Sequence, residues 1–444
     1  MKKIITLLNL MLCMFATAQE ITDGEYMYIF HNDQTIERIE ISKIDSVTFV
    51  NPYLNIEPSL PKVYITTPDG VGITSKTTWV ENSTIRIVDE YGVENLNIST
   101  SIKGRGNTTW NYPKKPYAIK LDSKSEVLGM PKHKRWVLLA NWMDRTLLRN
   151  DVAFEMARRI MEWAPRGKFV ELYLNGEHQG NYYLCEQIKV DKNRVNIDEL
   201  DEKTDFSDAS QITGGYILEY DKNNPITGEI NYFYSKIKNF PVTIKEPDEE
   251  VITSWEHQGF LYVQEYINSL EQLLEDDKNE RVRWNEINEL IDIKSYIDWW
   301  LVHEICRNSE VLHPKSCYMY KKRNGKLCAG PAWDFDWGTF TMNNKNSTIV
   351  TSALYYGYLF KYTEFKLAVK ERWAEVKETF ADIDNYIQEQ ANLIKSSNET
   401  NIEMWPITQS VNGDEKMTFD EAIEKMRSAF KARMETIDSY ISAL

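Results

Sequence analysis

Two carboxylates separated by one aromatic residue form the pattern in this chain that most directly indicates chemistry. They are Asp334 and Asp336, in the run WDFDWG over residues 333–338. Ionised carboxylates in an apolar setting need a cation or hydrogen-bond donors nearby. A hard divalent cation held by carboxylate oxygens meets this need, and so does an Asp-rich structural turn, because structural networks perturb carboxylates too. The pattern therefore leaves a metal site and a structural turn both open.

The segment before these carboxylates predicts a polar loop followed by a hairpin. Residues 307–316 are mostly polar, and the run CYMY over 317–320 is typical of a strand. Asn324-Gly325 is typical of the turn that closes a two-residue hairpin. A second short strand then leads into WDFDWG, so the hairpin is expected to position the two aspartates.

A second candidate site is the glycine-rich run GRGNTTW over residues 104–110. A glycine-rich turn between strands lets backbone amides approach phosphate oxygens, and a lysine on the following strand neutralises them. Lys120, sixteen residues after Gly104, ends the run YAIK on such a predicted strand. A glycine pair more often marks an ordinary turn, so this pattern alone leaves both interpretations open.

The elements that must position these residues change type along the chain. Alternating apolar residues predict strands over 63–121 and 136–140, a helix from Asp144 or Thr146 to Met161, and a further strand over 214–220. A hairpin is predicted over 169–186, closed by Asn175-Gly176 and ending at Glu186. Beyond about residue 250 the apolar period is helical, which predicts helices over 260–274, 293–306, 363–380, 383–396 and 418–444. The predicted fold class is α+β, with a strand-rich N-terminal half and a helical C-terminal half.

The N-terminus has the pattern of an export signal. Two lysines, an apolar stretch and the small residues Ala16-Thr17-Ala18 predict a signal peptide over 1–18. A small β segment and linker over 19–56 and one main domain over 57–444 are expected to follow. Removing residues 1–18 takes away two lysines and no acids, so the formal charge of −15 becomes −17. An acidic chain without a later apolar span predicts no nucleic-acid partner and no transmembrane segment, and a secreted or cell-surface location.

The remaining cysteines leave their redox state open. Cys317 and Cys328 flank the predicted hairpin, and either a disulfide across it or two buried free thiols accounts for them. With Cys185 and Cys306 they match no zinc-binding spacing.

Six ordered sequence blocks together resemble one known family. They are GRGNTTW, PKKPYAIKLD, WVLLANWMDRTLLRND, LNGEHQGNYYLCEQIKVDKNRV, GGYILEYD and GPAWDFDWG. This combination, running from about residue 61 to 444, resembles the CotH kinase family, the spore coat protein H-like secreted kinases. The resemblance implies an atypical protein-kinase-like fold of two lobes with an ATP cleft. It also implies transfer of the ATP γ-phosphate, with Mg²⁺ or Mn²⁺, to a hydroxyl group, with a Ser or Thr of a secreted or cell-surface protein as the expected acceptor.

The resemblance also implies roles for particular residues. Asp334 would bind Mg²⁺, and Asp336 would assist it. On an extended chain both side chains would point the same way, whereas an early turn would leave only one of them facing the cleft. The nucleotide residues implied by the match are Gly104, Arg105, Gly106, Asn107, Thr108 and Thr109 over the triphosphate, Lys120 at a phosphate, and Glu186 at the nucleotide end of the hairpin.

The chain departs from the family pattern in the loop before the metal motif. Active members carry a catalytic aspartate there, often followed by an asparagine. Here Glu310 is the nearest carboxylate, and Lys315 and Ser316 lie where the asparagine is expected. Glu310 is therefore the expected catalytic base, while a lysine in a metal-ligand position would repel Mg²⁺ or replace the charge of one ion. The alternative hypothesis is a catalytically silent surface-binding or scaffold protein associated with glycans.

Overall fold

The structure, a computed structural model, describes residues 26–30, 36–44, 59–223, 231–276, 280–342, 345–409 and 412–444. The chain divides into two compact units, Met1–Glu57 and Pro58–Leu444. In the smaller unit, strands β1 (Tyr26–Phe30) and β2 (Ile36–Glu40) pair antiparallel, and a 3-10 turn follows at Ile41–Lys43. The expected signal peptide lies outside the described residues.

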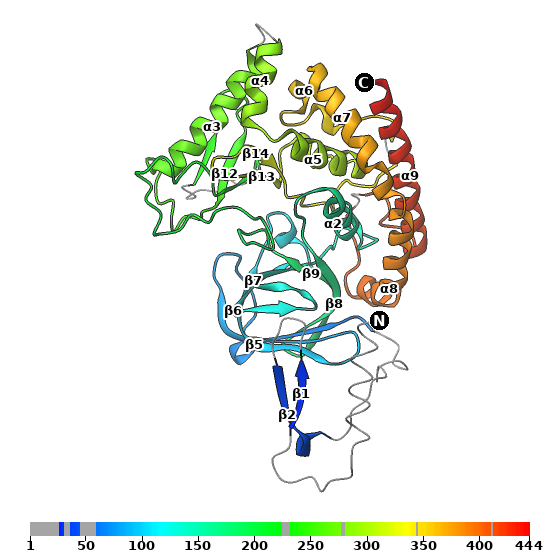
Figure 1. Ribbon diagram of the computed structural model, residues 1–444. Helices are drawn as coiled ribbons and strands as arrows, with labels where there is room; N and C mark the ends of the chain where they lie inside the picture. The colour runs from blue at the N-terminus through cyan, green and yellow to red at the C-terminus, as the bar shows by residue number, and fades with distance from the viewer. Residues whose placement is uncertain are drawn as a thin grey trace, which may run out of the picture. The chain divides into compact units, whose positions relative to one another are not determined.

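A closed barrel of seven strands forms one end of the larger unit (Figure 1). Its strand order is β3-β4-β5-β6-β7-β9-β8, with every pair antiparallel except β3 and β8. The strands are β3 (Lys62–Thr66), β4 (Val80–Val88), β5 (Glu94–Gly104), β6 (Tyr117–Val127), β7 (Met130–Leu139), β8 (Gly167–Leu174) and β9 (Glu177–Glu186). Alternate apolar residues such as Ile102, Ile119 and Trp136 fill the interior, because side chains on a strand alternate between its two faces.

The predicted hairpin over 169–186 is confirmed. Leu174 pairs with Glu177, so Asn175 and Gly176 alone connect β8 to β9. Both have positive φ, 52° and 84°, as this tight hairpin turn requires.

A five-stranded sheet of order β11-β12-β10-β13-β14 lies beyond the barrel. Its strands are β10 (Tyr216–Tyr220), β11 (Tyr232–Tyr234), β12 (Pro241–Glu246), β13 (Cys317–Lys321) and β14 (Leu327–Ala329). β13 and β14 form the predicted hairpin, but the prediction of a two-residue turn is wrong. Lys321 pairs with Leu327, so residues 322–326 form the connection. Thr213 holds this wider loop by accepting from the Asn324 backbone N–H and donating to its side chain.

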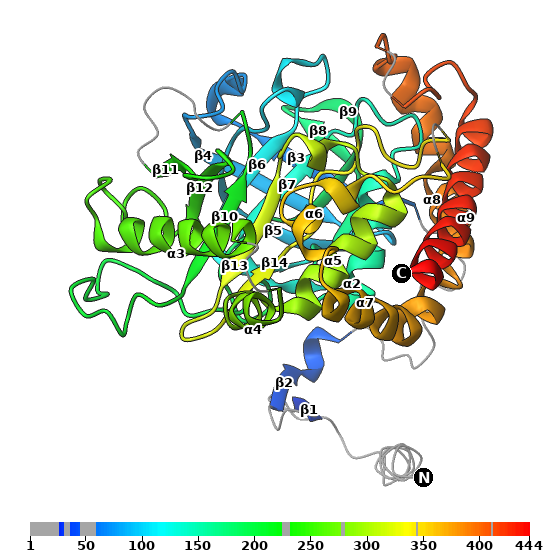
Figure 2. The ribbon, with the colours of Figure 1, turned by 90° about the horizontal axis from the view of Figure 1, so that it is seen from above.

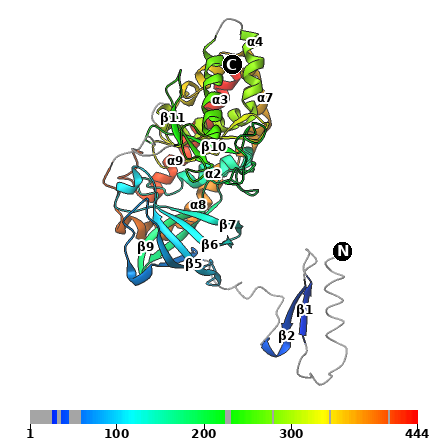
Figure 3. The same cartoon turned by 90° about the vertical axis from the view of Figure 1, so that its left-hand side faces the viewer.

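Helices cover the sheet and the barrel. They are α2 (Arg149–Ile160), α3 (Gln258–Glu275), α4 (Glu280–Leu290), α5 (Ile293–Cys306), α6 (Tyr356–Leu359), α7 (Thr363–Val376), α8 (Ile383–Met404) and α9 (Phe419–Ala443). Short 3-10 turns lie at Pro68–Gly70, Thr109–Asn111, Glu310–Leu312, Val350–Ser352 and Lys377–Phe380. Figure 2 shows α8 and α9 along one flank, and Figure 3 shows α3, α4 and α7 at the end opposite the barrel. The α+β class is therefore confirmed.

Several helix boundaries and two helices differ from the predictions; α7 ends at Val376 rather than at residue 380, and α6 was not predicted. α2 starts at Arg149, because Leu147 has a left-handed φ of 59° that interrupts a helix. α8 continues to Met404, and α4 was not predicted. The capping box of Thr418 and Glu421 fixes the start of α9 where predicted.

Two further expectations are decided by the described residues. Cys185, Cys306, Cys317 and Cys328 are buried free thiols. Cys328 lies opposite Tyr320 on β13, so the register does not place it against Cys317. Within the described parts of the chain, no helix is long and apolar enough to cross a membrane.

Candidate functional site

The run WDFDWG forms a turn rather than the end of a strand. Asp334 and Gly338 both have left-handed φ, 67° and 68°. The chain is therefore turned rather than extended at the two aspartates, so the case in which both side chains share one face of an extended chain does not apply. Asp334 is partly exposed, while Asp336 is almost fully buried. A left-handed φ at a residue other than glycine costs of the order of 1 kcal/mol and persists only where the surroundings enforce it.

Three asparagines from distant segments hold the backbone of this turn. Asn308 Nδ2 donates to the Asp334 carbonyl oxygen at 3.1 Å. Asn150 Oδ1, on α2, accepts the Phe335 N–H at 2.8 Å. Asn412 donates to the Asp336 carbonyl oxygen at 3.0 Å and accepts the Gly338 N–H at 2.8 Å. These bonds replace the sheet partners that the turn lacks, and so they fix the orientation of both carboxylates.

An apolar layer lies beneath the turn. The Phe335 ring contacts Phe154 of α2 edge-on, with ring centroids 6.2 Å apart, and His303 of α5 at 4.7 Å. Trp333 also stacks on Phe154, with ring centroids 5.4 Å apart. The aromatic residue between the two aspartates thus anchors the turn in the core.

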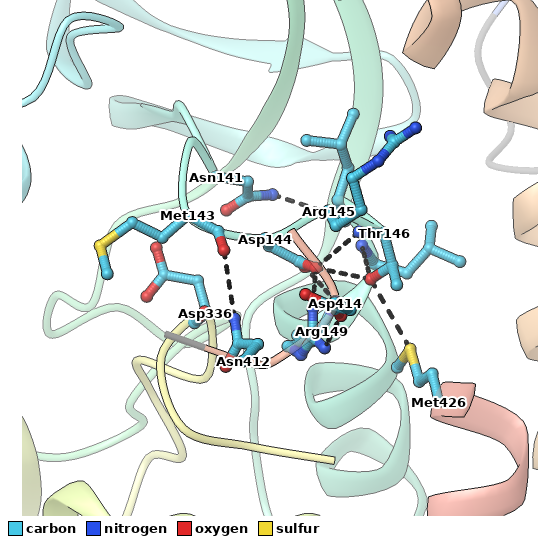
Figure 4. Close-up of polar contacts among 12 residues, drawn as sticks. Asn141, Met143, Asp144, Arg145, Thr146, Arg149, Asp336, Asn412, Asp414 and Met426 are labelled. Atoms are coloured by element: carbon cyan, nitrogen blue, oxygen red, sulfur yellow. Dashed lines mark hydrogen bonds and ion pairs between the residues drawn. The ribbon is translucent and has the colours of Figure 1, made fainter. Parts of the chain in front are cut away.

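A buried ion triad braces the turn from the side of α2 (Figure 4). The Arg149 guanidinium contacts the carboxylates of Asp144 and Asp414, and its Nε donates to the Thr339 carbonyl oxygen at 3.2 Å. The Asp336 carboxylate points away from this triad in Figure 4. The segment between α8 and α9 thus contacts the turn through Asn412 and contacts Arg149 through Asp414.

Other carboxylates surround Asp334. Glu310 lies on the 3-10 turn after α5, and Glu219 and Asp221 lie at the end of β10. Burial, followed by the charge of Asp334, raises the pKa of Glu310 to about 7. Burial and then the charge of Glu219 raise the pKa of Asp221 to about 6. Burial and the charges of Asp334 and Glu310 hold the pKa of Asp336 well above its usual value.

Two cations face this acidic group. Lys315 Nζ lies 2.9 Å from Glu310 Oε1. The Arg105 guanidinium packs over the Trp333 ring, 5.4 Å from its centroid. Burial raises the pKa of Asp334, and the Ser316 side chain and the Arg105 charge partly oppose that rise. The site is therefore a cluster of acids with only partial compensation, and such a cluster favours binding of a further cation.

The predicted nucleotide residues lie in the loop after β5 and on strands β6 and β9. A Cβ at Gly104 would overlap the Trp110 ring, and one at Gly106 would overlap the Thr109 hydroxyl. These glycines therefore make room for neighbouring side chains of their own loop, whether or not they also approach a phosphate. Arg105, between them, lies over the Trp333 ring, and its charge acts on Asp334. Asn107 and Thr108 lie just before the 3-10 turn Thr109–Asn111, and Thr108 is exposed.

Lys120 and Glu186 lie apart from the carboxylate cluster. Lys120 is exposed on the outer face of β6, where it pairs with Arg135 of β7. Glu186 is fully buried, and both of its carboxylate oxygens accept hydrogen bonds from Arg166, at 2.8 and 2.9 Å. The structure thus brings together Asp334, Asp336, Glu310, Lys315 and Arg105.

Glu219 and Asp221 were not predicted as site residues. A signal for them is present in the run EYD over 219–221, which repeats the spacing of DFD at the end of an apolar strand. Tyr318 donates to Glu219 at 2.7 Å, and the backbone N–H groups of Asn223 and Ser316 donate to Asp221. These bonds hold both carboxylates on the side of the cluster formed by β10.

The carboxylate oxygens of this site suit a hard cation whose remaining ligands come from a substrate. Among the described residues, no three His, Cys, Asp or Glu side chains converge as a ready-made metal cage. Mg²⁺ at phosphate-transfer sites is typically bound by one or two carboxylates, with phosphate oxygens and waters completing its shell. Asp334 and Asp336 fit that smaller requirement.

A family model described as CotH kinase protein matches residues 102–437. The match covers the barrel from β5 onward, the sheet, and the helices through most of α9. The chain belongs to the CotH family. No curated protein sequence matches the chain.

Proposed function

We propose that this protein is an exported phosphotransferase that moves the ATP γ-phosphate to a hydroxyl group of a secreted or cell-surface protein. The observation that carries the proposal is the juxtaposition of Asp334 with Glu310, a carboxylate whose pKa is raised to about 7. A group with that pKa accepts a proton near neutral pH, as a catalytic base must. The family match supports kinase-like chemistry, and the signal pattern over 1–18 supports export.

The fold supports a two-lobed kinase-like interpretation. The barrel would be the N-terminal lobe, and the sheet with its helices the C-terminal lobe. The carboxylate turn, the Glu310 loop and Arg105 come from both, since Arg105 follows β5 and the others follow α5 and β14. ATP would then lie between the lobes, with its triphosphate near Gly104–Thr109 and Lys120.

Each residue of the cluster has a role in this proposal. Asp334, with help from Asp336, would hold Mg²⁺ or Mn²⁺, and the ion would neutralise the phosphate charge. Glu310 orients the acceptor hydroxyl and takes its proton. Lys315 holds the Glu310 carboxylate in place through their ion pair. Arg105 adds positive charge where charge develops during transfer.

A second candidate function is a catalytically silent binding or scaffold protein. The Lys315–Glu310 ion pair favours it, because a lysine bonded to the candidate base competes with both an acceptor hydroxyl and a metal ion. The two candidates differ in whether phosphate is transferred.

The test uses the chain from Gln19 to Leu444 with ATP and either Mg²⁺ or Mn²⁺. Phosphate transfer to a mixture of Ser/Thr-containing proteins is measured with labelled ATP, and binding is measured as a rise in Tm. Asp334→Asn should abolish metal-dependent transfer and keep the fold, because Asn308 bonds the backbone of residue 334 rather than its side chain. Transfer by Asp334→Asn at the parental rate in saturating Mg²⁺ would make this turn structural.

Export has its own measurement. Intact-mass analysis of secreted protein should find an N-terminus near Gln19, since Ala16-Thr17-Ala18 supplies the small side chains that a signal peptidase needs.

A further inference from the structure

Two large apolar side chains are exposed on the loops that carry the carboxylate site. Trp337 of the WDFDWG turn is 38% exposed, and Leu312, on the 3-10 turn that begins at Glu310, is 42% exposed. The other large apolar residues of these two loops are buried: Val311, Trp333 and Phe335. Single exposed apolar residues are ordinary on a protein surface, so the position of these two beside the site matters more than their exposure.

The two loops are in direct contact, and the backbone around Trp337 is fixed. Ser309 Oγ lies 3.5 Å from the Gly338 carbonyl oxygen, and a Cβ at Gly338 would lie 2.6 Å from the same hydroxyl oxygen. Asn412 donates to the Asp336 carbonyl oxygen and accepts the Gly338 N–H. These bonds hold the residues on both sides of Trp337, so its exposed ring has a defined place.

Lys315 connects the Trp337 ring to the candidate base. Its Nζ lies 5.4 Å from the centroid of the Trp337 ring and 2.9 Å from Glu310 Oε1. The ring and the carboxylate are therefore both neighbours of one ammonium group. Successive residues of an extended peptide advance by about 3.3 Å, so a side chain one or two residues from a hydroxyl held at Glu310 can reach the ring.

The charges beside the ring disfavour two classes of peptide side chain. Trp337 directly follows Asp336, and Glu310 lies across the Lys315 ammonium, so an acidic side chain would meet like charges. A basic side chain on the ring would repel the Lys315 ammonium, which already makes a cation–π contact there. An apolar or aromatic side chain has neither cost, and it buries the exposed part of the ring.

We propose that Trp337 is a specificity-determining residue that binds an apolar or aromatic side chain one or two residues from the acceptor hydroxyl. The acceptor hydroxyl belongs to the proposed phosphotransferase function, on which this assignment rests, whereas the docking surface depends only on the exposed ring and its neighbours. Leu312, on the adjoining loop, is a second exposed apolar side chain available to such a peptide. The competing occupant is a basic side chain attracted by the carboxylates.

A peptide array tests this assignment with the chain from Gln19 to Leu444. Each peptide carries one serine, and the two residues on either side of it are varied in turn among glycine, leucine, phenylalanine, lysine and glutamate. Phosphate transfer from ATP with Mg²⁺ or Mn²⁺ is measured on the array, and so is binding of the fluorescently labelled protein without ATP. Leucine or phenylalanine at one position should raise kcat/KM about tenfold over glycine, mainly through a lower KM.

Variants at position 337 separate a docking role from a structural one. Trp337→Ala should raise KM for the leucine peptide about tenfold and remove the preference over glycine, whereas Trp337→Phe, which keeps an aromatic ring, should retain most of the preference. Trp255→Ala is the matched control, because Trp255 is 55% exposed in the segment before α3, and it should keep the parental preference. Tm shows whether each variant is folded, and Trp337→Gln replaces Trp337→Ala if the alanine variant is not.

The outcomes distinguish this assignment from the proposed function. A parent without a preference for leucine or phenylalanine overturns the assignment, as does an unchanged preference in folded Trp337→Ala. A lysine preference that disappears in Trp337→Ala would assign the ring to a basic residue and contradict the apolar occupant. In a parent that transfers no phosphate, binding of the leucine peptides that is lost in Trp337→Ala would support the docking surface and contradict the phosphotransferase, and no such binding would contradict both.

Discussion

Lys315 Nζ donates to Glu310 Oε1 at 2.9 Å, which places a positive charge on the carboxylate best situated to act as a base. The pKa of Glu310 is nevertheless raised to about 7, because burial and the Asp334 charge outweigh the lysine. Glu310 is therefore close to half ionised at neutral pH.

Replacing Lys315 should move the pH dependence of phosphate transfer. Transfer needs ionised Glu310, so the parental rate should rise through about pH 7. Lys315→Met removes the neighbouring positive charge and should shift this rise upward by about one pH unit. Rates measured from pH 5.5 to 9 at saturating ATP check this, with Lys315→Arg as the control. A rise that stays in place would show that the proton acceptor is another group.

Glu310→Gln should lower turnover far more than it lowers ATP affinity. The variant keeps the size of the side chain and removes its capacity to accept a proton. Measuring kcat together with the ATP dissociation constant separates the two effects. Equal losses in both would indicate a role in nucleotide binding.

Asn412→Ala should destabilise the carboxylate turn, although residue 412 is far from the turn in the sequence. The variant loses the bonds to the Asp336 carbonyl oxygen and the Gly338 N–H. We expect a cost of about 1–3 kcal/mol in stability and several-fold weaker Mn²⁺ binding, measured by electron paramagnetic resonance. Asn392→Ala, an exposed asparagine on α8, is the control. Reduced stability with unchanged Mn²⁺ affinity would limit Asn412 to a structural role.

Stability without metal should fall as the pH rises from about 4 to 6, in part because of Asp221. Its pKa is raised from 3.8 to about 6, so the folded state holds a proton more tightly than the unfolded chain does. The stabilisation is complete below the unfolded pKa and is lost as pH rises through the folded one, by up to about 3 kcal/mol. Asp221→Asn should flatten this slope in denaturant unfolding with EDTA, whereas Asp122→Asn, which is exposed, should not. Equal slopes in parent and Asp221→Asn would refute the assignment.

Lys114→Met should destabilise the larger unit by about 2–4 kcal/mol. Lys114 is completely buried and donates to the carbonyl oxygens of Ala140 and Asn181 and to Asn401 Oδ1. The substitution leaves all three acceptors without this donor. Lys115→Met is the matched neighbour, because Lys115 is partly exposed and donates to one carbonyl oxygen, that of Trp110. Denaturant midpoints for the two variants give the comparison.

The sequence by itself determined the fold class, the family and most elements. The Asn175-Gly176 turn and the capping residue Thr418 are local signals, because each acts on its own few residues. Apolar periodicity predicted α5 over Ile293–Cys306 with both ends correct. The same periodicity could not predict the width of the β13–β14 connection, since Thr213, far away in the chain, holds Asn324.

The site depended on contacts that no local pattern encodes. The spacing of Asp334 and Asp336 selected this segment as the candidate site, but the asparagines at 150, 308 and 412 decided that it turns. A sequence motif selected Lys120. No local pattern indicated that Lys103 and Arg135 both contact Trp79, because β5 and β7 take up their register beside β6 only in the closed barrel. The raised pKa of Glu310 likewise comes from burial and from Asp334, twenty-four residues away in the sequence. Charge and burial at the carboxylate cluster depend on segments that are distant in the sequence, so only the tertiary structure sets them.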